Sequence, residues 1–533
     1  MYSYLFHGAT LVDGSGAPPR QADVALAGSR IAAVAERIDG PAAIRVDAGG
    51  LVLAPGFIDI HSHTDGTLFR YPGAESKAFQ GVTVEVTGNC GLGLFPVAPG
   101  RETELADYLR LHDFLLPDEP FAWNDFASYA DRLDRLGPGL NLAPLVGHAP
   151  LRIAAMGMDD RPPTGAELER MCGLLAAALD QGAWGMSTGL IYPPGSYAAT
   201  DELVTLARTL ADHGVLYASH IRNEGDGLMG ALEEAITIGR ESGVRVQVSH
   251  LKALGSANRG RGPEALALLA GARAEGIDIG ADQYPYDASS TTLSAVVPQW
   301  AHAGGVAALL HRLNDPALRP VLLEEIGREM AAREGADGIM ITHCRSERNR
   351  PLSGLTLARI ASAWGCPPEE AVIRLLLDEK GWVGAIFFSM AAEDVAAILA
   401  DQLVSVGSDG HGLNAAETVG EATHPRSYGA FARVLGRFVR DESGSLSLAA
   451  AIHKMTGLPA SRIGFTDRGL VRPGFAADLA LFDPATIGDT ADYADPHRYA
   501  TGMVHLMVNG EPVMRNGALT GTRPGRVLRR KRS

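Results

Sequence analysis

Basic residues are scarce in this chain. Its 47 lysines and arginines stand against 62 aspartates and glutamates, which gives a formal net charge of −15. Proteins that bind DNA or RNA need a positive face that displaces counterions from the phosphates. The charge balance therefore argues against a nucleic-acid partner.

Long apolar runs are also missing, since no uninterrupted stretch approaches the roughly 20 residues that a membrane-spanning helix needs. Residues 1–7 lack the cationic and apolar stretches of a secretory signal peptide. Charged residues make up 20% of the chain and hydrophobic residues 46%, which is typical of a globular protein. We expect a cytoplasmic protein without a membrane partner.

There are only four cysteines, which are too few for a disulfide framework. None lies close enough to another to form the paired motifs of zinc knuckles or thioredoxin-like proteins. Each cysteine must therefore be judged by its own surroundings. They are Cys90, Cys172, Cys344 and Cys366.

Both ends of the chain have the pattern of short strands separated by turns. Apolar stretches alternate with glycines near the N-terminus, and a similar texture returns at 477–482 and 504–511. Neither end alone has much core to bury. We therefore predict one small β-sandwich domain built from residues 1–54 and 466–533, with two independent β modules as the less favoured alternative. The predicted N-terminal strands are 5–11, 23–27, 31–34 and 44–47.

Residues 55–465 alternate short apolar runs with helical patterns, as consecutive parallel strand–helix units require. Apolar residues three and four positions apart predict helices at 167–182, 201–213, 228–242 and 263–275. Eight candidate strands predict a closed (β/α)8 barrel of the TIM type, so the expected fold class is α/β. The eight strands are 56–60, 82–87, 140–146, 183–187, 215–219, 244–249, 277–282 and 403–407.

A long segment, about 294–400, separates the seventh candidate strand from the eighth. It has a strand-like piece of its own at 338–342 together with helical patterns. We predict that it is an insertion in the barrel. The connections that follow barrel strands lie at the C-terminal face, so we expect this insertion to lie over the barrel mouth.

Residues of metal-binding types follow five of the candidate strands, at the end where barrel enzymes have their active sites. His61 and His63 are two positions apart in an extended segment, so both imidazoles can face the barrel axis. One thiolate and two imidazoles leave a fourth zinc position free for water, which is typical of a catalytic zinc site. The other strand-end residues are Cys90, His220, His250 and Asp409.

Each of these residues also has an ordinary structural explanation. A His-x-His pair is common, and a single cysteine is more often a small buried apolar residue than a ligand. A lone histidine can be a hydrogen-bonded core residue, and an Asp-Gly pair is usually a turn. The coincidence of five strand ends in one barrel favours a metal site over these separate explanations.

Six short motifs contain the candidate site residues or lie beyond the last candidate strand. They are residues 55–63, 88–91, 219–224, 249–252, 408–410 and 424–426. Together they resemble the D-aminoacylases, which are the N-acyl-D-amino-acid deacylases of the amidohydrolase superfamily. The resemblance runs nearly end to end and includes the closing segments 476–478 and 508–510, which belong to the small β domain in this superfamily.

The resemblance implies a metal site with one tightly bound zinc ion, held by Cys90, His220 and His250. It also implies that His61 and His63 border either a second, weaker metal position or the reaction centre, and that Asp409 is the proton-transfer group. Many relatives bridge two metals with a carboxylated lysine after the fourth strand. Residues 185–189 contain no lysine, which favours the deacylase branch over hydantoinase-like or dihydroorotase-like enzymes.

The expected reaction is hydrolysis of the amide bond of an N-acyl-D-amino acid, a small-molecule substrate. Asp409 is expected to take a proton from the attacking water and to return it to the departing amine nitrogen. For the α-carboxylate we expect a cation and hydrogen-bond donors from Lys252, Tyr192 and Tyr284. The resemblance adds Ser289, in a loop similar to the family's carboxylate-binding loop. Lys252 as a solvated surface lysine, and the tyrosines as edge packing, are the alternatives.

Residues 291–300 contain no arginine or lysine, so this loop offers no cation for an acidic substrate side chain. Ile191 and Val297 are apolar candidates for lining a pocket. We therefore expect a neutral or hydrophobic D-residue, an expectation that fails if the insertion contributes Arg345 or Arg348. A cyclic-amide hydrolase and a non-catalytic metabolite-binding barrel are the alternative functions. The sequence leaves the oligomeric state open.

Overall fold

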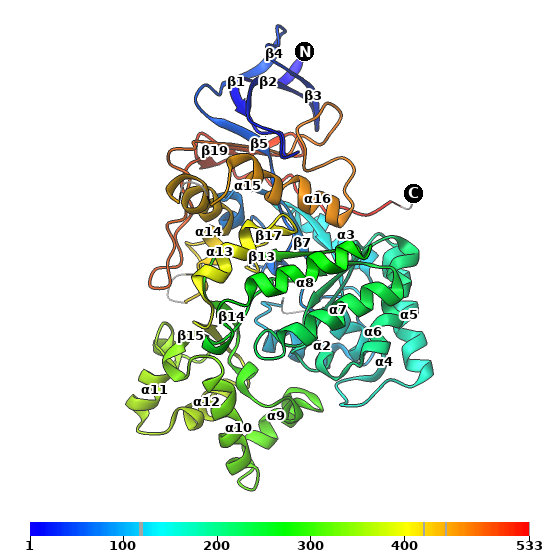
Figure 1. Ribbon diagram of the computed structural model, residues 1–533, viewed down its shortest axis with the longest axis vertical. Coiled ribbons are helices and arrows are strands. Elements are labelled where there is room, and N and C mark those ends of the chain that lie inside the picture. The colour runs from blue at the N-terminus through cyan, green and yellow to red at the C-terminus, as the bar shows by residue number, and fades with distance from the viewer. Residues whose placement is uncertain (117–120, 419–421, 443–444, 532–533) are drawn as a thin grey trace.

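The computed structural model describes residues 1–116, 121–418, 422–442 and 445–531, and its central part is a parallel β barrel (Figure 1). All eight predicted barrel strands are present, and the third consists of two pieces, β8 and β9, separated by Leu145. One sheet has the order β6-β7-β8 and the other β9-β10-β11-β12-β13-β17. The strands are β6 (Phe57–Asp59), β7 (Val82–Thr87), β8 (Asn141–Pro144), β9 (Val146–Gly147), β10 (Gly185–Gly189), β11 (Leu216–His220), β12 (Arg245–Val248), β13 (Ile279–Gln283) and β17 (Val404–Val406).

The barrel closes where the segment after β6 meets the segment after β17. The backbone N–H of Asp409 donates to the His61 carbonyl at 2.8 Å, and the N–H of His63 donates to the Gly410 carbonyl at 3.0 Å. Ser62 and Gly410 form a parallel bridge between these two contacts. Barrel closure therefore brings the first and last predicted site residues of the barrel together.

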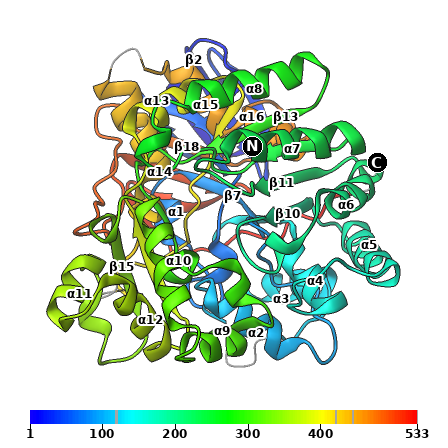
Figure 2. The same cartoon turned by 60° about the horizontal axis from the view of Figure 1, so that its bottom comes forward.

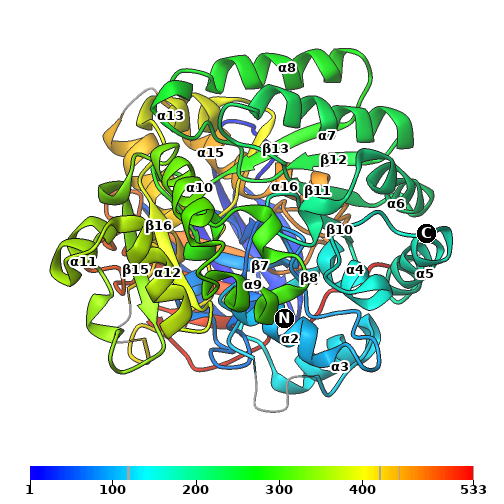
Figure 3. The ribbon, with the colours of Figure 1, turned by 90° about the horizontal axis from the view of Figure 1, so that it is seen from below.

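Helices cover the outside of the barrel, as Figure 3 shows for the half made by β10 to β13. Each helix packs against the next in sequence and buries its apolar stripe on the strands. Thr164 starts α5 with a reciprocal capping box to Glu167, which satisfies amide groups at the helix N-terminus. The four predicted helices begin and end within two residues of the observed ones, which are α5 (Gly165–Asp180), α6 (Thr200–His213), α7 (Leu228–Ser242) and α8 (Gly262–Ala274).

Both ends of the chain join in one sheet, at the top of Figure 1. The two halves meet where β5 (Val52–Pro55) pairs antiparallel with β18 (Leu479–Phe482). Their side chains share one apolar core, in which Phe6 and Leu26 from the start of the chain accompany Leu479. The other strands are β1 (Tyr2–Leu11), β2 (Arg20–Ala27), β3 (Arg30–Ala35), β4 (Ala42–Asp47), β19 (Met503–Val508), β20 (Glu511–Arg515) and β21 (Ala518–Leu519).

The predicted fold class is therefore confirmed: an α/β barrel carries a small β domain from both termini. The domain boundaries at 54 and 465 stay predictions, and residues 532–533 lie outside the described part of the chain. No helix among the described residues is long and apolar enough to cross a membrane.

The insertion between β13 and β17 lies over the open end of the barrel (Figures 2 and 3). Its antiparallel sheet has the order β14-β16-β15, and its helices enclose a separate apolar core. The sheet begins at Ser289, a few residues before the predicted start of the insertion. Its elements are β14 (Ser289–Thr292), β15 (Ile339–Cys344), β16 (Val383–Phe387), α9 (Gly305–Leu313), α10 (Arg319–Ala331), α11 (Leu357–Trp364) and α12 (Pro368–Asp378).

Candidate metal centre

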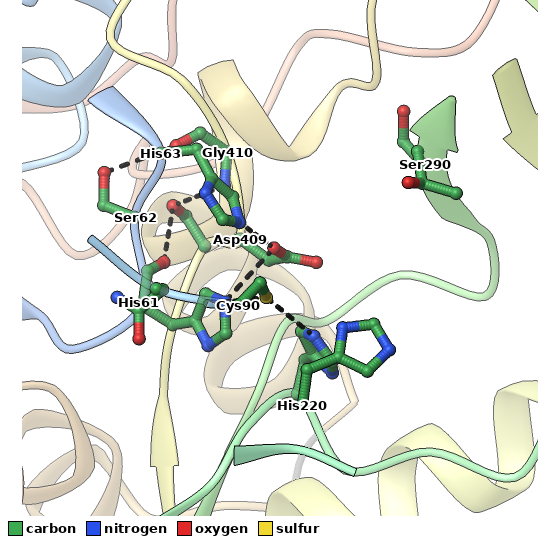
Figure 4. Close-up of polar contacts among 12 residues, drawn as sticks. His61, Ser62, His63, Cys90, His220, Ser290, Asp409 and Gly410 are labelled. Carbon is green, nitrogen blue, oxygen red and sulfur yellow. Dashed lines mark hydrogen bonds and ion pairs between the residues drawn. The ribbon is translucent and has the colours of Figure 1, made fainter. Parts of the chain in front are cut away.

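The predicted metal ligands meet at the C-terminal end of the barrel (Figure 4). One group has its ligand atoms within 4.8 Å of one another and consists of Cys90, His220 and His250. A second group meets the same limit and consists of His61, His63, Cys90 and Asp409. Among the described residues these are the two clusters of this kind, and they share the Cys90 sulfur.

The loop after β7 holds Cys90 in a left-handed backbone conformation with φ of 55°. Its Sγ lies 3.3 Å from the Nε2 atoms of both His61 and His250. A Cβ on the preceding Gly88 would lie 2.3 Å from the Leu145 carbonyl oxygen, so this position requires glycine. His250 and Asp409 also have positive φ, at 36° and 51°. Such backbone strain at non-glycine residues clusters at functional sites.

The electrostatics favour the metal-binding forms of Cys90 and His220, but not that of His250. Burial and Lys252 lower the pKa of His250, but the charges of Cys90 and Asp409 outweigh them and raise it above its ordinary value, so a cation that binds there must displace a proton. Burial raises the pKa of the Cys90 thiol, but the charges of His61 and His250 outweigh it and hold the pKa well below its ordinary value. Burial lowers the pKa of His220, which therefore stays neutral at pH 7. A thiolate and a neutral imidazole are the protonation states that zinc requires.

His220 supplies the test of whether a metal fits. Both of its ring nitrogens are buried without a hydrogen-bond partner among the described residues. Leaving such atoms unpaired in the interior costs free energy. A cation that accepts the lone pair of one of these nitrogens, beside the Cys90 thiolate, removes the part of this cost that belongs to that nitrogen. The donor set of one sulfur and two nitrogens fits zinc.

Asp409 is surrounded by positive charge. Its Oδ1 lies 2.9 Å from His63 Nε2 and 3.3 Å from His61 Nε2, and its Oδ2 lies 2.6 Å from Nη1 of Arg426 (Figure 4 shows the histidine contacts). Burial raises the pKa of this carboxyl, but Arg426 and His250 lower it well below its ordinary range. Asp409 is therefore ionised at neutral pH and can accept a proton.

Three further residues hold this centre and were not predicted from the sequence as site residues. Asp282, at the end of β13, lies 3.0 Å from His61 Nδ1 and accepts a hydrogen bond from the His250 N–H at 2.8 Å. Glu224 lies 3.1 Å from His250 Nδ1 and 3.7 Å from His220 Nε2. Arg426 is the third. The sequence signals existed, because two of the motifs contain Glu224 and Arg426 and a candidate strand ends at Asp282.

Three of the four predicted substrate-binding residues line the cavity above the metal centre. The cavity has a volume of about 120 Å³. It shares lining residues with a second chamber of about 440 Å³ under the insertion. Lys252 lines it but is paired with Glu224 rather than free. The other two lining residues are Tyr192 and Ser289.

Tyr284 is different, because this buried side chain is not among the residues that line the cavity. Its hydroxyl donates to the sulfur of Met390 at 3.5 Å. The face of its ring lies 5.8 Å from Lys252 Nζ and 4.9 Å from the Arg426 guanidinium carbon. Tyr284 therefore contacts the two cations through the face of its ring, and its hydroxyl does not reach the cavity.

Neither arginine named for the insertion lines this cavity. Arg345 borders a neighbouring chamber, and the Arg348 side chain is 68% exposed. Arg333 and Arg110 line the cavity instead, and both are paired, with Glu329 and Asp107 respectively. The preference for a neutral or hydrophobic side chain stays a prediction, because two arginines line the cavity although each is paired with a carboxylate.

The fold and the site define a class of protein: a (β/α)8 barrel with a group of candidate metal ligands at the C-terminal ends of the strands and an ionised carboxylate beside them. A model of the amidohydrolase family matches residues 45–514. The chain belongs to this family.

Within this family, the chain is similar to particular proteins over nearly its whole length. The chain is 39% identical to a D-aminoacylase of Alcaligenes xylosoxydans xylosoxydans over 99% of this chain and 98% of that protein. It is also 39% identical to an N-acyl-D-glutamate deacylase of the same organism, over 99% and 97%. The crystal structure of the N-acyl-D-glutamate deacylase from Bordetella bronchiseptica, complexed with zinc and a phosphonate inhibitor, superposes with a TM-score of 0.83. That match has 38% identity and covers 99% of both chains.

Proposed function

We propose that this protein hydrolyses the amide bond of N-acyl-D-amino acids and releases a carboxylate and a free D-amino acid. The observation that carries the proposal is the ionised Asp409, which lies beside the Cys90–His220–His250 cluster at the floor of a cavity. The relatives named above, similar over nearly their whole length, are deacylases of D-amino-acid derivatives.

Zinc is the proposed metal, held tightly by Cys90, His220 and His250. When bound, it supplies a Lewis acid for the amide carbonyl and lowers the pKa of a water molecule towards ~7. His61 and His63, with Cys90 and Asp409, form the proposed second and weaker position. The shared thiolate supports different affinities, because two cations that compete for one sulfur repel each other.

Asp409 is the proposed proton carrier. As an ionised carboxylate it takes a proton from the attacking water, and the neutral acid then gives this proton to the departing amine nitrogen. His63, at 2.9 Å, and Arg426, at 2.6 Å, hold the two carboxylate oxygens in place through these steps. The backbone of the same residue is fixed by its hydrogen bond to His61.

The α-carboxylate of the substrate is proposed to bind on the Asp409 side of the cavity, because the amine nitrogen must be within reach of Asp409. Arg426 and Lys252 supply positive charge on this wall, and Ser289 supplies a hydroxyl. Tyr192 also lines the cavity, and its hydroxyl is hydrogen-bonded to the Thr291 hydroxyl at 2.9 Å. A carboxylate accepts well from charged donors and hydroxyl groups of this kind.

A neutral or hydrophobic substrate side chain suits the remaining walls. Burial lowers the pKa of His112 and of His411 to about 4, so both imidazoles are neutral at pH 7. Ile191 and Leu254 line both chambers, and Val297 lines the larger one. These walls present apolar surface without an unpaired charge for an acidic group.

Two alternatives are set against this proposal. A cyclic-amide hydrolase with a carboxylated lysine is disfavoured because β10 consists of Gly-Met-Ser-Thr-Gly. A barrel that binds a metabolite without turnover is disfavoured because Asp409 is ionised beside the candidate ligands.

The deciding experiment is a turnover screen with zinc-loaded protein. Paired N-acetyl-D- and N-acetyl-L-amino acids, with methionine, leucine, phenylalanine and glutamate side chains, are tested beside hydantoin and dihydrouracil. We expect release of free amino acid from the D-series only, and faster release for the neutral side chains. Cleavage of the L-series alone, cleavage of the rings alone, or no turnover contradicts the proposal.

A further inference from the structure

Lys77 is a fully buried charge for which the proposed chemistry has no use. It lies on the short helix α1 (Glu75–Ala78), and its side chain has no exposed surface. An ammonium group has three donors, and all three are engaged within the protein. They bond to Oδ2 of Asp59 at 2.7 Å, to Oγ of Ser408, and to the carbonyl of Gly410 at 3.1 Å. No donor remains for substrate, so Lys77 acts on the protein itself.

Two of the three acceptors are the chain neighbours of Asp409. Ser408 precedes it and Gly410 follows it, so Lys77 holds the residue on each side of the proposed proton carrier, Ser408 by its side-chain hydroxyl and Gly410 by its backbone carbonyl. Asp409 itself has φ of 51°. A non-glycine residue stays in this region only where its surroundings hold it there. The contacts of Lys77 are independent of those that the Asp409 carboxylate makes.

Asp59, at the end of β6, also bonds to Ser408 and to Lys77. Its Oδ1 accepts from the Ser408 N–H at 2.9 Å, and its Oδ2 accepts from the Ser408 hydroxyl as well as from Lys77. The same hydroxyl oxygen accepts from the Gly410 N–H at 3.0 Å. The 408–410 segment is thus tied to a barrel strand by buried charged groups.

The network also reaches the histidine segment. Lys77 Nζ lies 3.5 Å from Oε1 of Glu85, and this oxygen accepts from the hydroxyls of Ser62, at 2.8 Å, and Thr64, at 2.6 Å. Those two residues flank His63. Figure 4 shows Ser62, His63, Asp409 and Gly410 lying together.

We propose that Lys77 is a positioning residue: with Asp59 and Glu85 it locks segments 61–64 and 408–410 together and so fixes the Asp409 carboxylate against His63. The inference rests on the proposed function for its kinetic consequence. Its structural consequence, the 2.9 Å contact between Asp409 and His63, does not depend on the substrate.

The kinetic test compares two buried lysines. Lys77→Met is expected to lower kcat by about 100-fold, the cost of a misplacement near 1 Å, while KM and the zinc content stay within a factor of three. The matched control is Lys454→Met. Lys454 is also buried, and it donates to the carbonyls of Asp401 and Val404 at the opposite end of the same strand, β17. We expect this control to lose stability but to keep kcat.

A gentler variant covers the case in which Lys77→Met does not fold. Ser408→Ala keeps every charge and removes one acceptor of Lys77, and about a 10-fold loss in kcat at unchanged KM is expected from a smaller displacement. A crystal structure of either folded variant is expected to show the contact between Asp409 and His63 lengthened beyond hydrogen-bonding distance.

The inference is overturned if folded Lys77→Met or Ser408→Ala keeps wild-type kcat, or if Lys454→Met loses as much. It is also overturned if the variant crystal structure retains the contact. If the wild-type protein cleaves no substrate in the screen, the proposed function fails, and the crystal structures alone decide on the role of Lys77.

Discussion

Asp409 has two neighbours that tune it in different ways. Arg426 lowers the pKa of its carboxyl, and His63 holds one of its oxygens. In the proposed reaction a weak base with a low pKa would suffice, because a bound metal would also acidify the water. The environment of this one carboxylate is therefore what distinguishes the proposed hydrolase from a barrel that only binds its ligand.

The first prediction concerns Asp409→Asn. An amide cannot accept and return the proton, so kcat is expected to fall by about 10²- to 10⁴-fold, with zinc content unchanged by elemental analysis. Asp394→Asn is the control, because its buried carboxylate accepts from the backbone of Gly260 and Gly262, at the start of α8. Near-wild-type turnover in Asp409→Asn contradicts the assignment.

The second prediction separates binding from chemistry at Arg426. Arg426→Met removes a cation from the proposed carboxylate site, so KM is expected to rise by about 10-fold or more. Because Arg426 lowers the pKa of Asp409, its loss raises that pKa. The acidic limb of the pH–kcat profile is then expected to move to higher pH. The variant is compared through full pH profiles with Arg433→Met, which alters an arginine at the other end of α14 (Arg426–Arg433) that is paired with Asp489. An unchanged acidic limb in Arg426→Met counts against this role.

The third prediction concerns Glu224, which contacts one proposed ligand, His250, directly. A carboxylate in this position orients the imidazole and raises its basicity, so Glu224→Gln is expected to weaken zinc binding by about 10- to 100-fold. A competition titration with a chelator measures the affinity. Glu234→Gln is the control, since Glu234 pairs with Arg222 and touches none of the proposed ligands. Equal affinity in the two variants refutes this role of Glu224.

At the scale of elements, the C-terminal ends of the barrel strands hold the candidate site, and the contacts at their N-terminal ends concern the stability of the fold. α15 (Leu448–Met455) brings Lys454 to the start of β17, where burial lowers the pKa of its amine to about 8. In the unfolded chain the same group has its ordinary pKa of 10.5. Between pH 8 and 10.5 the unfolded state therefore binds more protons than the folded state.

The fourth prediction follows from that difference. The free energy of unfolding rises with pH wherever the unfolded state binds more protons. The free energy of unfolding of the wild type, relative to that of Lys454→Met, is therefore expected to increase by about 1 to 3 kcal/mol between pH 8 and 10.5. Chemical denaturation of both proteins at several pH values measures the gap. A gap that stays constant or narrows as the pH rises argues against a depressed pKa for Lys454.

The same scale shows why some predictions succeeded. The strands and helices of the barrel carry strong periodic patterns, and the structure confirms each of the eight strands and four helices that these patterns predicted. The strand β14 was not predicted. Ser289–Thr292 is polar and half-buried, so it lacks the apolar alternation of a strand and forms one only by pairing with β16.

At the scale of the whole molecule, a metal bound at the proposed site would couple binding to folding, because the proposed ligands come from strand ends far apart in the sequence. A metal that binds only the folded chain stabilises it by about 2.7 kcal/mol at 100 times its dissociation constant. The fifth prediction is that chelation abolishes turnover and lowers the thermal midpoint, and that zinc restores both. Calorimetry with and without zinc measures the shift.

Two cysteine variants control this experiment. Cys90→Ser is expected to lose the zinc-dependent shift, because a serine hydroxyl is a poor zinc ligand. Cys172→Ser alters a partly buried cysteine on α5, so it is expected to shift as wild type does. A full zinc-dependent shift in Cys90→Ser indicates that the stabilising ion binds elsewhere.

The sequence by itself determined the barrel, the joining of the two ends in one β domain and the proximity of Cys90, His220 and His250. These follow from local periodicity and from the rule that parallel strands end at one face. Only the tertiary structure decided which groups contact each other. Glu224 pairs with Lys252, and Arg426 pairs with Asp409. The Tyr284 hydroxyl bonds to Met390 and not to a group in the cavity, and Lys77 bonds to Asp59, Ser408 and Gly410. Such pairings join residues far apart in the sequence; Lys77 and Gly410 are separated by 333 positions. They depend on packing distances that no local pattern encodes.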